Sequence, residues 1–136
     1  RIAFLLALAV LALIPLRVFS EDKPETKAQA AAEQWLALVD AGKFDESWKD
    51  AASYFKGAVS QEQWKQAVGA VRTPLGGLVS RKLKSAKPAK SLPGAPDGDY
   101  VVIQFDTSFE HKKAAVETIT PMLDNGQWKV SGYFIK

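Results

Sequence analysis

The chain has 136 residues, of which 47% are hydrophobic and none is cysteine. This length has room for one domain, and the hydrophobic fraction is high enough for a packed core, which argues against a disordered chain. Within these residues, the absence of cysteine excludes disulfides, thiolate metal sites, a cysteine nucleophile and a lipid-modified cysteine. Any folded domain here must therefore be held together by packing and polar contacts.

The first twenty residues have the pattern of a signal peptide. Ile2–Leu16 is an apolar run between Arg1 and Arg17, and it is shorter than the roughly 20 residues that a membrane-spanning helix needs. We therefore expect a signal peptide at residues 1–20, a single domain at residues 21–136, and a periplasmic or secreted protein. A retained anchor is the alternative, and a membrane contact is expected only through this segment.

Charge is nearly balanced once residues 1–20 are removed. That removal takes away two arginines and no acid, which leaves 16 Lys and Arg against 15 Asp and Glu. Such a balance argues against nucleic acid as the main partner. One segment is nevertheless cationic and contains no acid: Arg81, Lys82, Lys84, Lys87 and Lys90. It is either a surface for anionic head groups or an acidic partner, or an edge strand whose lysines prevent aggregation.

The first half of the domain predicts three helices. Apolar residues recur at spacings of three and four over Lys27–Gly42, where Gly42 is a left-handed cap. A second helix follows at once and ends at Gly57. Ser60 and Gln63 form a capping box for a third helix that runs to about Arg72. The residues of this third helix that we expect to face the core are Trp64, Ala67, Val68 and Val71.

The second half predicts four strands. Asp99–Phe109 is rich in β-branched and aromatic residues and alternates, with one nearly apolar face. A short strand at Leu78–Ser85 precedes it, and a type I′ turn at Asn125-Gly126 joins strands at Ala114–Leu123 and Trp128–Lys136. The predicted fold is therefore α+β, with three helices packed on a curved, four-stranded antiparallel sheet.

The predicted register has a problem that a β-bulge would solve. If pairing continued without interruption through both hairpins, the apolar residues of the last strand would point away from the core. Pro121 cannot donate a ladder hydrogen bond and is typical of edges and bulges. We therefore predict an extra residue in the third strand, in a bulge at Thr120–Met122. It would return three residues to the core: Trp128, Val130 and Phe134.

The same register places Asp106 opposite Glu117, where two like charges are destabilising. A cation such as Arg81 or Arg72, a water-filled pocket or a shifted register would relieve the repulsion. Paired carboxylates can carry out acid–base chemistry, and a pair bridged by arginine is the structural alternative. His111, the only histidine, lies on a predicted turn, so neither catalysis nor a zinc site is expected from it.

Several segments together carry a resemblance to a known family. They are Trp35–Phe44, Ser47-Trp48, Arg72–Gly76, Ser80-Arg81, Pro96–Tyr100, Gln104-Phe105, Glu117-Thr118 and Gly126–Ile135. They resemble the bacterial "domain of unknown function 4019" family of small exported proteins over nearly all of residues 21–136. The resemblance implies no activity, because the family has none assigned. The order of elements also resembles a cystatin-like or nuclear-transport-factor-two-like roll, which hosts enzymes, ligand binders and interaction modules alike.

The function that we expect is non-enzymatic binding of a partner protein or an envelope component, without a cofactor or a metal. The alternative is a small-molecule binder that uses the cleft between the helices and the concave sheet. An enzyme that uses Asp106 and Glu117 is a third alternative. Trp35 and Trp48 also fit an apolar core. The candidate binding residues are Trp35, Trp48, Arg72, Arg81, Asp106, Glu117 and Tyr133.

Overall fold

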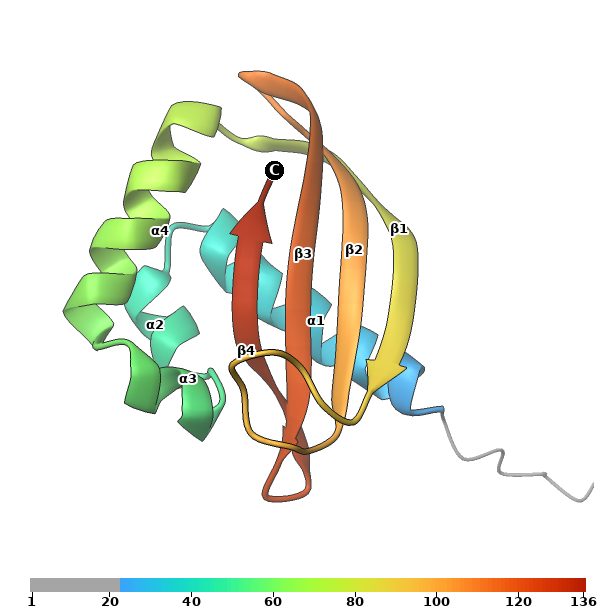
Figure 1. The fold of residues 1–136 in the computed structure, drawn as a ribbon. Helices are drawn as coiled ribbons and strands as arrows, with labels where there is room; N and C mark the ends of the chain where they lie inside the picture. The colour runs from blue at the N-terminus through green and yellow to red at the C-terminus, as the bar shows by residue number, and fades with distance from the viewer. Residues whose placement is uncertain (1–22) are drawn as a thin grey trace, which may run out of the picture.

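The structure is a computed structural model that describes residues 23–136 (Figure 1). The signal peptide predicted at residues 1–20 lies outside the described residues. The chain forms four helices and then four strands: α1 (Pro24–Asp40), α2 (Phe44–Lys49), α3 (Ser53–Ala58), α4 (Gln61–Leu75), β1 (Leu78–Ala89), β2 (Tyr100–Phe109), β3 (Lys112–Asp124) and β4 (Gln127–Ile135). The strands form one antiparallel sheet in the order β1-β2-β3-β4. The predicted α+β fold is confirmed.

The helices cover one face of the sheet and one of its sides. Figure 1 shows α1 crossing one face, while α2, α3 and α4 gather beside β4. The core lies between α1 and the sheet, and its cluster runs from Ala28 to Val130. All residues of this cluster belong to the described range 23–136. Within this range, no helix is both long enough and apolar enough to cross a membrane.

The second predicted helix is two short helices, α2 and α3. Ala52 lies between them in an extended conformation, and its N–H donates to the carbonyl of Val130 at 2.8 Å. Asp124 accepts hydrogen bonds from the backbone N–H and the hydroxyl of Ser53, at 2.8 and 2.9 Å. The apolar stripe predicted one helix, but these contacts with the β3–β4 hairpin break it, because they direct the N–H of Ala52 toward the sheet.

Helix α4 begins as predicted and ends later. The capping box is confirmed, since Ser60 and Gln63 exchange hydrogen bonds of 3.0 and 3.2 Å. The helix continues through Pro74 to Leu75. Its buried stripe is narrow and consists of Trp64, Val68 and Arg72. The prediction that Ala67 and Val71 face the core is wrong, because both are exposed.

The register between β2 and β3 differs from the prediction by one residue. Phe105, not Asp106, lies opposite Glu117, and a register shift follows Thr107. The turn is the pair Glu110-His111, and the register shift inserts one extra residue into β3, so the β3 side chains beyond it lie on the opposite face from the one predicted. Glu117 consequently lies on the buried face of the sheet, and Asp106 is exposed on the other face.

The predicted bulge exists at the predicted place, but its extra residue lies in β4. Thr120 pairs with Gly132 and Pro121 with Val130, which leaves Ser131 unpaired. The Ser131 hydroxyl donates to the Thr120 carbonyl at 2.7 Å, so a polar side chain satisfies the interrupted ladder. Val130 is buried and Trp128 packs against the core, as predicted. The prediction for Phe134 is wrong: it is 59% exposed, and Tyr133 takes the inward position.

The β3–β4 turn is the predicted type I′ turn, with φ of 50° at Asn125 and 78° at Gly126. We expect Gly126→Ala to lower the free energy of unfolding by about 1 kcal/mol, because a side chain is strained at this φ. Gly57 in α3 is the control, since both positions have open space around a new Cβ. Gly57→Ala should raise stability by about 0.5–1 kcal/mol. Urea unfolding measures both, and a loss of similar size in both variants would contradict the explanation.

Candidate functional site

Four charged side chains from distant parts of the chain meet between the helices and the sheet. Asp40 ends α1, Arg72 lies in the last turn of α4, Arg81 is on β1, and Glu117 is on β3. The Arg81 Nε donates to Glu117 Oε1 at 2.7 Å, and its Nη1 donates to Asp40 Oδ2 at 2.8 Å. The Arg72 Nη2 donates to Asp40 Oδ1 at 2.8 Å. We call these four residues, with Thr107 and Tyr133, the ionic cluster.

Glu117 is the most enclosed member of the ionic cluster, with no exposed surface. Its Oε1 also accepts from the Thr107 hydroxyl at 2.6 Å. Its Oε2 accepts from Arg81 Nη2 at 3.1 Å and from the Tyr133 hydroxyl. A buried carboxylate is costly unless it is paired and hydrogen-bonded. Here each oxygen has two donors, so the charge of Glu117 is fully accommodated by the protein.

The protonation states follow from burial and from these hydrogen bonds. Burial disfavours the charge of Asp40, but hydrogen bonds from Arg81 and Arg72 outweigh it and hold the pKa of Asp40 below its usual value. Burial also opposes the charge of Arg81, while hydrogen bonds to Asp40 and Glu117 raise its pKa. Burial, and then the negative charge of Glu117, raise the pKa of Tyr133. Tyr133 is therefore a neutral donor, and two arginines balance two carboxylates.

Arg72 contacts an aromatic ring as well as the carboxylate of Asp40. Its guanidinium carbon lies 4.7 Å from the centre of the Phe109 ring, a cation–π geometry. Its Nη1 lies 3.5 Å from the Tyr133 hydroxyl. The Nε of Arg72 is buried and has no hydrogen-bond partner among the described residues. The cluster thus joins α1, α4, β1, β2, β3 and β4 through one set of contacts.

The structure brings together four of the seven residues predicted for the site: Arg72, Arg81, Glu117 and Tyr133. Trp35 is 1% exposed, and its indole N–H donates to the Ser47 carbonyl at 2.8 Å. The partly buried Trp48 donates in the same way to the Val59 carbonyl. The two tryptophans belong to the core, which was the alternative for them.

Asp106 does not join Glu117, and the predicted carboxylate pair is wrong. The one-residue difference in register places the two side chains on opposite faces of the sheet. Two of the three expected remedies for their repulsion are present together, since the register is shifted and Arg81 neutralises Glu117. The enzyme hypothesis required both carboxylates in one enclosed site, and this arrangement does not occur.

Sequence reasoning missed two members of the ionic cluster, Asp40 and Thr107. A carboxylate is unfavourable at the C-terminal end of a helix, where the backbone carbonyls carry partial negative charge. Asp40 is the last residue of α1, and no basic residue lies in that turn. This mismatch was a signal that a cation elsewhere in the fold binds Asp40. Thr107 was visible only as the one polar residue on the buried face of β2.

The space between α1 and the sheet, which the small-molecule alternative requires, is filled by side chains. Trp35 packs against Trp64 and Tyr133, with ring centres 5.7 and 5.4 Å apart. Phe105 and Ile119 close the same layer, with exposures of 1% and 0%. Trp35 and Tyr133, which were expected to line a cleft, thus help to fill this space.

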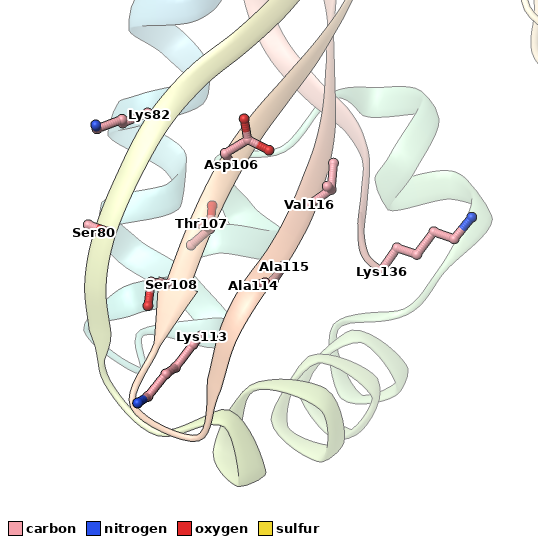
Figure 2. A pocket seen from close by; sticks show the side chains of 10 residues that line it. All are labelled: Ser80, Lys82, Asp106, Thr107, Ser108, Lys113, Ala114, Ala115, Val116 and Lys136. Carbon is pink, nitrogen blue, oxygen red and sulfur yellow. The ribbon is translucent and has the colours of Figure 1, made fainter.

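A shallow depression of about 420 Å³ lies on the face of the sheet that α1 leaves uncovered (Figure 2). Its floor consists of small side chains, with Ser108 and Ala114 among them. Lys82 from β1, Lys113 near the β2–β3 turn and Lys136 after β4 border it. Asp106, which lies opposite Lys82 in the β1–β2 register, is the single acid among the lining residues. The lining thus carries an excess of two positive charges.

The cationic segment divides between the interior and the surface. Arg81 belongs to the ionic cluster, and Lys90 pairs with Asp99. Lys82, Lys84 and Lys87 are exposed on β1 and take part in no ion pair within the described residues. Residues 23–136 contain no group of three or more His, Asp or Glu side chains that could hold a metal ion.

The comparison with protein families agrees with the resemblance seen in the sequence. The family described as "Protein of unknown function (DUF4019)" matches residues 31–133. The chain belongs to this family. The match spans every member of the ionic cluster, and it ends at Tyr133. No curated protein matches the chain. In this DUF4019 domain, the two features that stand out are therefore a neutral, enclosed ionic cluster and an open, cationic depression.

Removal of one partner should show that the ionic cluster is structural. We expect Arg81→Met to lower the free energy of unfolding by about 3 kcal/mol or more, because it leaves Glu117 buried without a cation. Lys82→Met, the next residue along β1 and exposed, should change it by less than about 0.5 kcal/mol. Urea unfolding at neutral pH compares them. Equal effects of the two substitutions would refute the role of Arg81.

Stability should also depend on pH through Asp40. Because the pKa of Asp40 is lower in the folded state than in the unfolded chain, its contribution is present above about pH 4 and is lost as the pH falls further. The stability difference between the wild type and Asp40→Asn should therefore be largest near neutral pH and shrink below pH 4. Asp106→Asn, which removes an exposed carboxylate outside the cluster, is the control. Parallel curves for the wild type and Asp40→Asn would contradict this.

Proposed function

We propose that this DUF4019 domain is a non-enzymatic interaction module of the cell envelope or the exterior, which binds an acidic segment of a partner protein. The binding surface is the depression on the uncovered face of the sheet. The observation that carries the proposal is the charge of its lining: Lys82, Lys113 and Lys136 against Asp106 alone. Export rests on the signal-peptide pattern of Ile2–Leu16.

The ionic cluster supports a binding role rather than a catalytic one. Its two carboxylates and two guanidinium groups neutralise each other, and both oxygens of Glu117 are already occupied by protein donors. A general acid or base needs a proton that it can exchange with a substrate within hydrogen-bond reach. Groups that are buried and fully paired are suited to fixing the fold, and this leaves recognition to the surface.

The form of the depression favours a protein segment over a membrane. Its floor of small side chains lets an extended backbone approach the sheet closely, while the lysines at its border can reach acidic side chains. A flat bilayer would meet only the rim. Each lysine near an anionic membrane contributes about 1 kcal/mol, so the three lysines of the border would give weak attachment. An acidic peptide uses the same charges together with the concave shape.

The test measures binding of a fluorescent oligoglutamate peptide to residues 21–136 by anisotropy. Replacing Lys82, Lys113 and Lys136 by Gln should weaken binding roughly tenfold, because each exposed ion pair contributes up to about 1 kcal/mol. Asp106→Asn should strengthen binding, because it removes the one opposing charge. The weakened variant should also show a smaller dependence on salt.

The matched control replaces three exposed lysines on the helical side, which changes the net charge equally: Lys27, Lys43 and Lys49. This control should bind like the wild type. Binding to anionic phosphatidylglycerol vesicles without binding to the peptide would overturn the proposal in favour of a membrane surface. Equal weakening by the two triple variants would also overturn it, because only net charge would then matter.

A further inference from the structure

The two edges of the sheet are protected to very different degrees. β1 carries three exposed lysines and Pro88, and its pairing with β2 has two register shifts, next to Val79 and Lys84. Lysines, prolines and bulges are devices that prevent an edge strand from pairing with another strand. β4, the other edge, has no charged residue and no proline between Ser131 and Ile135. This part of the edge therefore has neither charges nor proline, and α4 lies beside it on the far side of a groove.

The backbone of β4 has open hydrogen-bonding groups on this edge. Val116 and Lys136 exchange two backbone hydrogen bonds, of 3.0 and 2.9 Å. In an antiparallel ladder such pairs alternate, so the N–H and C=O groups of Tyr133 and Ile135 point away from β3. Neither residue makes a backbone hydrogen bond with another element among the described residues. Farther along the same edge, the carbonyl of Val130 is occupied by the Ala52 N–H.

Apolar surface accompanies the open backbone groups. Phe134 is 59% exposed and Val71 on α4 is 49% exposed. Between them, a groove of about 200 Å³ separates α4 from β4, with Val68 on one side and Ile135 on the other. Such a groove next to a free strand edge is the arrangement with which an added strand is usually recognised: the backbone gives affinity and the pocket takes a side chain.

We propose that the open edge of β4 pairs with β4 of a second copy of this chain, antiparallel and centred on Phe134. In this register Tyr133 of each copy lies opposite Ile135 of the other, so the open N–H and C=O groups of both residues are used in both copies. Phe134 then lies directly opposite Phe134 of the second copy, as a cross-strand aromatic pair. The dimer would continue the sheet across a two-fold axis.

Charge supports a second copy as the occupant. The stretch Ser131–Ile135 is neutral and can lie against itself without repulsion. The nearest charge in β4 and its extension is Lys136, two positions from the centre. The two copies of Lys136 would therefore lie about four residues apart along the strands, roughly 14 Å. This exceeds the distance of about 10 Å over which exposed charges interact at moderate salt. The lysine-rich β1 edge offers no such neutral stretch.

Sedimentation of residues 21–136 tests the oligomeric state. We expect a dimer whose population rises with concentration, and we expect Phe134→Lys to be monomeric, since two lysines would then lie directly opposite each other. Val79→Lys is the control, because Val79 is similarly exposed, at 64%, on the opposite edge; it should remain dimeric. A monomeric wild type throughout the concentration range, or a dimer that persists in Phe134→Lys, would overturn the proposal.

The absence of cysteine from the sequence makes the register directly measurable in the full chain. Directly opposite residues that are not hydrogen-bonded have Cα atoms about 4.5 Å apart, within the range of a disulfide. Phe134→Cys should therefore form a disulfide-linked dimer under mild oxidation, whereas Lys136→Cys, with copies roughly 14 Å apart, should not. Equal cross-linking at the two positions would show collision or another register and would contradict the proposal. Lys82 on β1 and Lys113 on β3 lie away from this edge, so substitutions at these two lysines test the depression without changing β4, and the two proposals can fail independently.

Discussion

The contact on which the rest of the domain depends is the bridge that Arg81 makes between Glu117 and Asp40. Glu117 lies in the middle of the sheet with no exposed surface, where an unpaired carboxylate would be too costly to keep charged. Arg81 reaches it from β1, and its other nitrogen atoms hold Asp40 at the end of α1. One guanidinium group thereby fixes the register of the edge strand β1 and the position of α1, and it neutralises the negative charge of the buried Glu117.

Much of the architecture could be predicted because local chemistry and global packing agree there. The alternation in β2, the capping box of Ser60 and the turn at Asn125 each have a physical cause within a few residues. The errors lie where a distant group decides the outcome. The helix between Gly42 and Gly57 is broken because Val130 and Asp124, far along the chain, bind its backbone.

The same division holds for the site. Arg81 was one of two arginines that the sequence offered to relieve the charge repulsion at Glu117, yet the residue predicted to lie opposite Glu117 across the strands was off by one. A single extra residue near a turn changes the face of a whole strand, and no periodicity in the flanking residues reveals it. Asp40 escaped notice because its partner, Arg81, is 41 residues away. Its unfavourable position on the helix was the only local sign.

The contact between Ser53 and Asp124 has a consequence for the order of events during folding. A helix of six residues such as α3 is not stable by itself, and its first turn here is held by a carboxylate 71 residues farther along the chain. Closing so long a loop is slow compared with forming a local turn. The β3–β4 hairpin must therefore be in place before α3 can persist, although α3 leaves the ribosome first. The middle of the chain therefore takes its final structure only after the C-terminal hairpin has formed.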